Sequence, residues 1–161
     1  MRDAFAKEMK SLAEQREKVV LLSGDIGNRM FDKYKSVSPE RFLNCGIAEA
    51  NMMSMASGMA LCGLKPVIYT ITPFTTVRCL EQIRNDLSYH NCSITIISSG
   101  AGFSYGPLGM THHCIQDIGY MSSIPDVNIM TPANVHEMEE IFEIDCGLKY
   151  IRIDKSQLDL K

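Results

Sequence analysis

Apolar residues along the chain alternate between helical spacing and short continuous runs. In residues 2–17, apolar side chains recur at helical intervals with charged residues between them, which predicts an amphipathic helix. Residues 18–25 instead form a short apolar run that ends in Ser-Gly-Asp, a pattern typical of a buried strand followed by a turn. The remaining pattern predicts an irregular loop at 26–40, helices at 47–62, 75–88, 113–122 and 134–145, and strands at 66–70, 93–98, 127–130 and 150–153.

The order of these elements predicts an α/β fold. Five strands joined by helical crossovers form a mostly parallel sheet, and helices on both faces complete a three-layer αβα architecture. Ligands of such sheets bind at the carboxyl ends of the strands. We therefore expect the binding residues in the loops that follow Ser23, Thr70, Ser98 and Met130.

Composition agrees with one globular domain. The chain has 161 residues, is 45% hydrophobic and 22% charged, and has a formal net charge of −3. This balance offers no general attraction for nucleic acid or for an anionic membrane. No apolar stretch is long enough to span a bilayer, and the charged start of the chain does not resemble a signal peptide. The six cysteines are scattered without a C-x-x-C pair, so we expect reduced thiols in a cytoplasmic protein.

One carboxylate stands out in the predicted helix at 47–62. Glu49 is the only ionisable carboxylate between Ile47 and Cys62, and the other residues there are apolar or small. A helix that is apolar on every side is expected to be buried, in the interior or at an interface. An unpaired charge in such a place is costly, so Glu49 is a candidate for sharing a proton with a ligand. The alternative is a capping role, because an acidic residue in the first turn complements the helix dipole.

Several short motifs follow one another in an order that resembles transketolases. The segment Arg41–Met52 reads RFLNCGIAEANM and resembles the family pattern RF-x-N-x-GIAE-x-NM. Further segments resemble family patterns in the same order: G-x-A-x-x-G-x-K-P at 58–66, TF-x-x-F at 70–74, the next helix at 76–84, DG-x-(T/S)H-x-x-x-ED at 109–118, and an IP…PAD pattern at 124–134. The ordered set is far more specific than any single motif, and it covers nearly the whole chain.

The resemblance is to the pyrimidine-binding domain of these thiamine-diphosphate-dependent enzymes, found in the C-terminal section of transketolase. It implies that Glu49 is the catalytic residue and hydrogen-bonds N1′ of the cofactor's aminopyrimidine. A carboxylic acid at N1′ favours the imino form of the 4′ nitrogen, which can then remove the proton from C2 of the thiazolium. The resulting ylide attacks a ketose carbonyl, and a two-carbon ketol unit passes to an aldose.

The resemblance also implies cofactor-binding residues around Glu49. Phe74 matches the second of two aromatic residues that pack on the pyrimidine, and Ile71 replaces the first. An aliphatic side chain at Ile71 still offers an apolar wall, although stacking is weaker. Asp25 matches an acidic position near the cofactor and the dimer contact, with a turn-forming aspartate as the alternative.

Two further residues match positions that bind the sugar substrate. His112 matches a histidine that contacts sugar hydroxyls, and Arg152 matches an arginine that can bind a substrate phosphate. The alternative for Arg152 is a surface ion pair with Asp154 or Glu143.

The chain departs from the family pattern near the sugar-binding loop. Leu108 stands where an acidic residue is expected, and the stretch that begins at Gly100 replaces a histidine. These departures predict a changed sugar specificity and favour a modified or nucleotide-linked sugar.

The family's diphosphate and metal site is not expected on this chain. In the family, that site is a GDG motif followed by an asparagine pair, in a separate domain. Residues 24–28 resemble its start only superficially, and we predict no metal ligands here. We therefore expect Mg²⁺ to be bound mainly by a partner diphosphate-binding domain or subunit, and the isolated chain to be inactive. Residues 1–154 form the predicted pyrimidine-binding domain, and residues 155–161 are interpreted as the start of a linker or tail.

Three functions remain open at this point. The leading one is a transketolase component that works as a homodimer with its diphosphate-binding partner. The second is a component like deoxyxylulose phosphate synthase or the β-type component of a 2-oxo-acid dehydrogenase, but the GIAE-x-NM segment and the 75–84 helix favour transketolase. The third is a non-catalytic dimerisation or regulatory domain, which Leu108 and Gly100 favour and Glu49 and Phe74 oppose.

Overall fold

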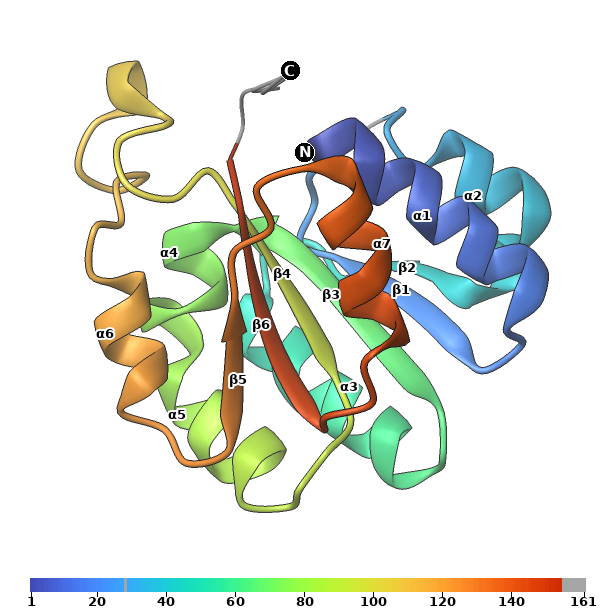
Figure 1. Cartoon of the computed structure of the whole chain (residues 1–161). Coiled ribbons are helices and arrows are strands. Elements are labelled where there is room, and N and C mark those ends of the chain that lie inside the picture. Colours follow the sequence, from blue (N-terminus) through green and yellow to red (C-terminus); the bar gives the residue numbers. More distant parts are fainter. Residues whose placement is uncertain (28, 155–161) are drawn as a thin grey trace.

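A six-stranded sheet forms the centre of the computed structural model, which describes residues 1–27 and 29–154 (Figure 1). Its strands lie in the order β2-β1-β3-β4-β6-β5, and every ladder between them is parallel. The strands are β1 (Val19–Ser23), β2 (Phe42–Asn44), β3 (Lys65–Ile71), β4 (Thr95–Ser99), β5 (Val127–Met130) and β6 (Leu148–Ile153).

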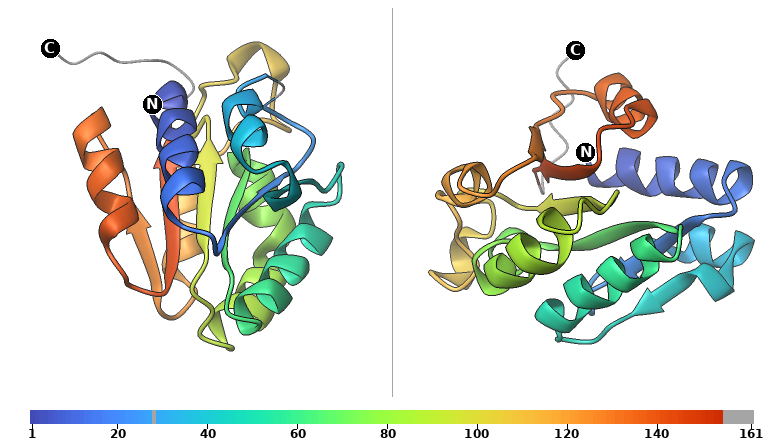
Figure 2. Two further views of the ribbon diagram at one scale, coloured as in Figure 1. Left: turned by 90° about the vertical axis from the view of Figure 1, so that its right-hand side faces the viewer. Right: turned by 90° about the horizontal axis from the view of Figure 1, so that it is seen from below.

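Helices cover both faces of the sheet (Figure 2). The α-helices are α1 (Arg2–Gln15), α2 (Asp32–Val37), α3 (Glu49–Leu61), α4 (Thr72–Thr75), α5 (Leu80–Gln82), α6 (Asp117–Ser122) and α7 (Val135–Glu143). Short 3₁₀ turns lie at Pro39–Arg41, Val77–Cys79 and Gly106–Leu108, and a π-helical turn lies at Ile83–Ser88. Helices α1, α2 and α7 pack on one face, while α3, α6 and residues 77–88 pack on the other. Within residues 1–27 and 29–154, no helix is both long and apolar enough to cross a membrane.

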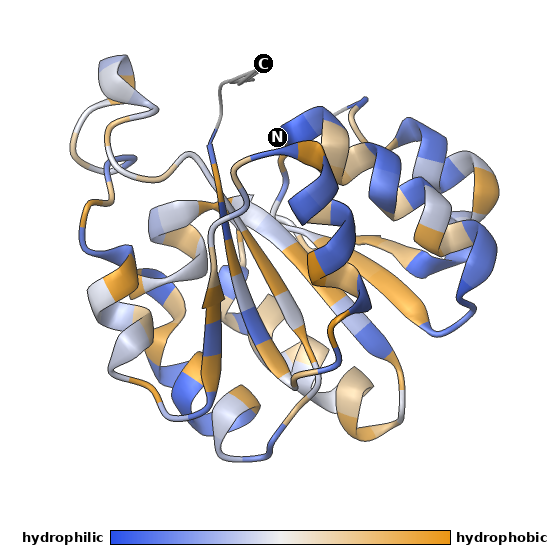
Figure 3. Cartoon of the chain, in the orientation of Figure 1, coloured by the Kyte–Doolittle hydropathy of each residue, from blue (hydrophilic) through white to orange (hydrophobic). Residues whose placement is uncertain are grey.

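Alternate strand residues point into two separate cores. Leu21 of β1 packs under α1 and α7, whereas its neighbours Val20 and Leu22 pack under α3. Each fully buried aliphatic side chain stabilises the fold by roughly 1.5–3 kcal/mol. Because both faces are covered, the strands carry many apolar residues, and orange segments run through the sheet in Figure 3, with blue segments between them on β6. The predicted three-layer α/β fold is confirmed.

The structure corrects the predicted loop at 26–40. This segment contains α2, and it leads directly into β2, a sixth strand that was not predicted. Strand β2 has three residues, pairs with β1, and lies at the edge of the sheet. A run this short carries no measurable periodicity, so pairing with β1 decides its conformation. The predicted helix at 75–88 is also divided into 3₁₀, α and π turns.

Helix α3 is buried on one face only. Met52, Met53 and Ala56 lie in the core, as the apolar sequence predicted. The opposite face carries Ser54 and Leu61, and Leu61 is 62% exposed. Burial in the interior therefore holds for one face of α3 only, and the opposite face is left open in the chain by itself.

Candidate active site at the carboxyl ends of the strands

The predicted site lies where the strand order reverses, between β1 and β3. Crossovers leave β1 in one direction and β3 in the other, and parallel sheets bind ligands at such a point. Gly24 follows β1 here and lies against β3 and α3. A Cβ atom on Gly24 would lie 3.1 Å from Thr70 Oγ1 and 3.3 Å from Glu49 Cγ, so a larger residue would push these groups apart. The absence of a side chain at Gly24 allows Glu49 to approach the end of the sheet.

Glu49 is the first residue of α3, and only 2% of it is exposed. The turn before it requires a positive φ of 68° at Gly46, a conformation that favours glycine. The Asn44 side chain stabilises this turn with two hydrogen bonds. Its Oδ1 accepts a hydrogen bond from the Gly46 backbone N–H at 3.0 Å, and its Nδ2 donates to Asp25 Oδ1 at 2.9 Å. Asp25 is exposed and therefore lies beside the site, where it anchors the loop that delivers Glu49.

Arg78 connects Glu49 to Phe74. Its Nη1 donates a hydrogen bond to Glu49 Oε2 at 2.8 Å, and its Cζ lies 3.8 Å from the centre of the Phe74 ring. The Phe74 ring in turn meets the His112 ring edge to face, with 5.2 Å between their centres. The structure thus brings three predicted residues, Glu49, Phe74 and His112, into one continuous row of contacts. Arg78 was not predicted, although it follows Phe74 by one helical turn.

Two polar groups near this row bear on its chemistry. The Thr70 hydroxyl is buried and has no hydrogen-bond partner within the described part of the chain, and it lies at Gly24 beside Glu49. An unpartnered buried hydroxyl is costly, so it suits a ligand that supplies a partner. Burial, followed by the negative charge of Glu49, raises the pKa of the Cys79 thiol to about 12. Cys79 therefore remains a thiol at neutral pH and is not a nucleophile.

Arg152 lies two strands away from β3, at the end of β6. Its Nε donates to Asp117 Oδ2 at 2.7 Å, and the Tyr150 hydroxyl donates to the same oxygen at 3.0 Å. Asp117 is completely buried, and burial raises the pKa of the Tyr150 hydroxyl. The alternative of a surface ion pair between Arg152 and Glu143 is wrong, because Arg152 pairs with Asp117 and Glu143 pairs with Arg16 at 2.6 Å.

Three further positions from the sequence analysis, Ile71, Gly100 and Leu108, lie in β3 and in the loop after β4. Ile71 is buried at the end of β3, three residues before Phe74. Gly100 has a φ of 75°, and the Tyr105 ring occupies the place where its Cβ would be. A histidine cannot stand at Gly100 in this conformation, so the departure from the family pattern has a structural cause. Leu108 is exposed in the 3₁₀ turn of the same loop.

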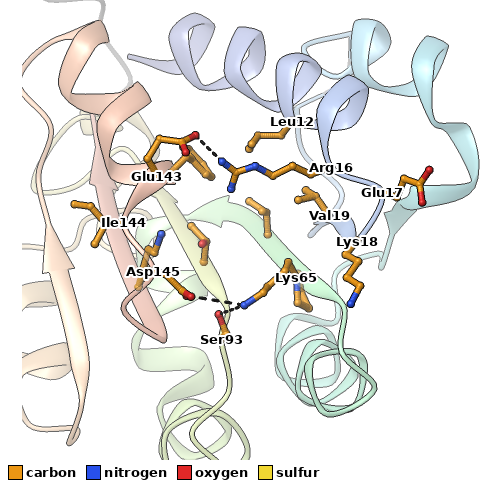
Figure 4. Close-up of a pocket in the computed structure, with 15 residues that line it drawn as sticks. Leu12, Arg16, Glu17, Lys18, Val19, Lys65, Ser93, Glu143, Ile144 and Asp145 are labelled. Atoms are coloured by element: carbon orange, nitrogen blue, oxygen red, sulfur yellow. Dashed lines mark hydrogen bonds and ion pairs between the residues drawn. The ribbon is translucent and has the colours of Figure 1, made fainter.

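A cavity lies at the opposite, amino-terminal ends of the strands (Figure 4). It has a volume of about 410 Å³ and lies at the amino ends of β1, β3, β4 and β6. Arg16 and Glu143 form an ion pair across it, and Lys65 donates to Ser93 Oγ at 2.9 Å. Lys149 also lines it, with its Nζ bonded to a backbone carbonyl and its pKa lowered by burial. Because the residues that line this cavity do not include Glu49 or Phe74, it is separate from the predicted site.

Comparison with known proteins identifies the family of the chain. The family model of the transketolase pyrimidine-binding domain matches residues 1–158. The chain belongs to the transketolase pyrimidine-binding domain family. The resemblance predicted from the motifs is therefore confirmed. The match passes the predicted domain end at 154, and residues 155–161, predicted as a linker, lie outside the described residues.

Relatives of this transketolase-type domain include a transketolase subunit and a synthase with a longer chain. An apulose-4-phosphate transketolase subunit from Actinobacillus succinogenes is 37% identical over 74% of this chain and 40% of its own length. A 1-deoxy-D-xylulose-5-phosphate synthase from Clostridium perfringens is 32% identical over 98% of the chain and 26% of its own length. The solved structure entitled "Split gene transketolase, inactive beta4 tetramer" is 31% identical, with a TM-score of 0.83 over 96% of this chain and 51% of that chain. The domain thus spans about half or less of each relative.

Proposed function

We propose that this domain is the pyrimidine-binding component of a transketolase-like enzyme that transfers a two-carbon ketol unit between sugars. The observation that carries the proposal is the Glu49 carboxylate, which is buried between β1 and β3 where the strand order reverses. Thiamine diphosphate, when bound, supplies the carbon that cleaves and forms bonds beside a carbonyl group. One relative is named as a single subunit of a transketolase, which supports a partner that provides the rest of the enzyme.

Residues of the chain fit the pyrimidine half of this cofactor. Glu49 would hold a proton at a ring nitrogen, because a carboxyl group enclosed by protein can exchange a proton with a bound base. Phe74 would support the flat ring, and Ile71 would contribute an apolar wall. The unpartnered Thr70 hydroxyl offers a further hydrogen bond. The diphosphate and Mg²⁺ would be held mainly by the partner domain, so the isolated chain would be inactive.

Sugar binding would involve His112 and the loop around it. The contact between the His112 and Phe74 rings supports a role for His112 at the mouth of the proposed pyrimidine site. Arg152 would reach a substrate phosphate with its two terminal nitrogens while Asp117 holds its Nε. We also propose that two copies associate through the open face of α3, and that the free cysteines reflect a cytoplasmic location.

Replacement of Glu49 by glutamine tests the proposal. The amide is nearly isosteric but cannot transfer a proton, so activity of the complex with its diphosphate-binding partner should fall by about 10²–10⁴-fold. Exchange of the C2 proton of bound thiamine diphosphate, followed by NMR in D₂O, should slow in parallel. Glu81→Gln, at an exposed position on α5, is the matched control and should leave both rates unchanged. A wild-type rate of C2 proton exchange in Glu49→Gln would contradict the proton-transfer role and leave Glu49 with a helix-capping role only.

A second candidate is a component like deoxyxylulose phosphate synthase, because a relative with that name is 32% identical over 98% of the chain. Both enzyme classes are compatible with the same carboxylate and sheet. The donor substrate distinguishes them. Carbon dioxide release from pyruvate would favour the synthase, whereas ketol transfer from a ketose phosphate without carbon dioxide release would favour transketolase.

A further inference from the structure

Arg78 makes two contacts at this site that a ligand would also need. A guanidinium is a flat cation with N–H donors along its edge, and Arg78 uses both properties. The guanidinium carbon, Cζ, lies 3.8 Å from the centre of the Phe74 ring, and Nη1 donates a hydrogen bond to Glu49 Oε2 at 2.8 Å. An aminopyrimidine is also flat, stacks on an aromatic face and presents polar nitrogens along its edge. Arg78 therefore makes the same two contacts that a bound aminopyrimidine requires.

The two groups cannot be accommodated together. Carbon atoms in contact lie about 3.5–4.0 Å apart, so a separation of 3.8 Å leaves no space for another ring between Arg78 and Phe74. The Glu49 side chain is 2% exposed, and Arg78 occupies one of its two oxygens. A ligand that stacks on Phe74 and hydrogen-bonds Glu49 must first displace the guanidinium.

The Arg78 side chain is also able to move away from Glu49 and Phe74. Its side chain is 41% exposed, in contrast to the enclosed carboxylate that it contacts. It lies in a short 3₁₀ turn, at Val77–Cys79, and its long stem can turn outward without any change in the strands. In this structure it provides the buried carboxylate with an opposite charge, whose absence would be costly.

We propose that Arg78 is an internal competitor for the pyrimidine site, with the contacts seen in this structure, and must move outward before the cofactor's aminopyrimidine can bind. This inference rests on the proposed function, because it assumes that Glu49 and Phe74 receive the pyrimidine. Ligand affinity is reduced by the fraction of chains whose site is closed by Arg78. The same displacement leaves a cation at the rim of the site.

The test measures binding of 4-amino-5-hydroxymethyl-2-methylpyrimidine to the 161-residue chain by NMR titration. This probe has no thiazolium or phosphate, so attraction of Arg78 for anionic groups does not contribute. Arg78→Met should bind the probe roughly tenfold more tightly than the wild type, a typical size for coupling between competing contacts. Arg78→Lys, which retains a charge but no flat surface, should fall between them. Arg84→Met, at an exposed arginine in the next turn, should match the wild type.

The outcomes separate this inference from the proposed function. Equal or weaker binding by Arg78→Met, with signals of Phe74 still shifted by the probe, would overturn the competitor role and leave the pyrimidine site in place. No shift at Phe74 in any variant at saturating probe would overturn both. Should Arg78→Met fail to fold, wild-type affinity in Arg78→Lys would overturn the competitor role.

Discussion

Replacement of Arg152 by methionine is expected to lower the free energy of unfolding by about 3 kcal/mol, because it leaves the Asp117 carboxylate buried without its cation. Asp117 is fully buried, and its contact with Arg152 Nε is 2.7 Å long. At an effective dielectric constant of about 20, two unit charges at this separation attract each other by about 6 kcal/mol. Arg152 is 27% exposed on its side chain, so water screens part of this attraction. Loss of one partner of a buried pair typically costs about 3–5 kcal/mol, and we take the lower end.

Urea denaturation measures this loss. With an m-value of about 2 kcal/mol/M, a loss of about 3 kcal/mol lowers the midpoint by roughly 1.5 M. The double variant Asp117→Asn with Arg152→Met should recover most of the stability, because the uncompensated charge is then removed while the Tyr150 hydroxyl retains an amide partner. Arg84→Met is the control for loss of an exposed arginine.

A contrary result would change the role of Arg152. A loss below about 1 kcal/mol in Arg152→Met, without recovery in the double variant, would refute the argument that Asp117 depends on Arg152. Arg152 would then be available with its whole guanidinium for a substrate phosphate, and KM for the phosphorylated substrate should rise in the variant.

Two further predictions concern the isolated chain. The Cys79 thiol has a folded pKa of about 12 against an ordinary value of 9.0, so the unfolded chain releases its proton first as pH rises. Stability should therefore decline above about pH 9, by about 1.4 kcal/mol at pH 10. Urea denaturation at about pH 7.5 and pH 10 should show this decline in the wild type and in the control Cys62→Ala, which removes an exposed thiol. The decline should be smaller in Cys79→Ala. Equal declines in all three proteins would contradict the raised pKa of Cys79. Sedimentation at micromolar concentration should show self-association that Leu61→Asp, on the open face of α3, weakens. A monomeric wild type would rule out that interface.

The fold could be predicted largely from the sequence because its signals are local. Strand β1 is an apolar run ended by Ser-Gly-Asp, and α1 has apolar residues at helical spacing, so neighbouring residues alone indicate these elements. Strand β2 gave no such signal, since three residues cannot show a period. Its conformation depends on hydrogen bonds to β1, a contact between segments that are separate in the chain.

The candidate site shows the same division. Glu49 stands out in the sequence because it is the only carboxylate in an apolar helix, and Phe74 follows from its motif. The contact between Glu49 and Arg78 joins residues 29 positions apart, and its existence depends on α3 and the 3₁₀ turn packing on the same face of the sheet.

Arg152 illustrates why tertiary structure decides the partners of charged residues. Strand period predicts that Tyr150 and Arg152 lie on one face of β6, because alternate side chains point the same way. It does not predict which acidic residue covers that face. Nearby Asp154 and Glu143 were reasonable partners in the sequence, but α6 places Asp117 over the strand, 35 positions away from Arg152. Local sequence determines which way a side chain points, whereas the partner depends on how distant segments pack, because the attraction between charges depends on distance in space.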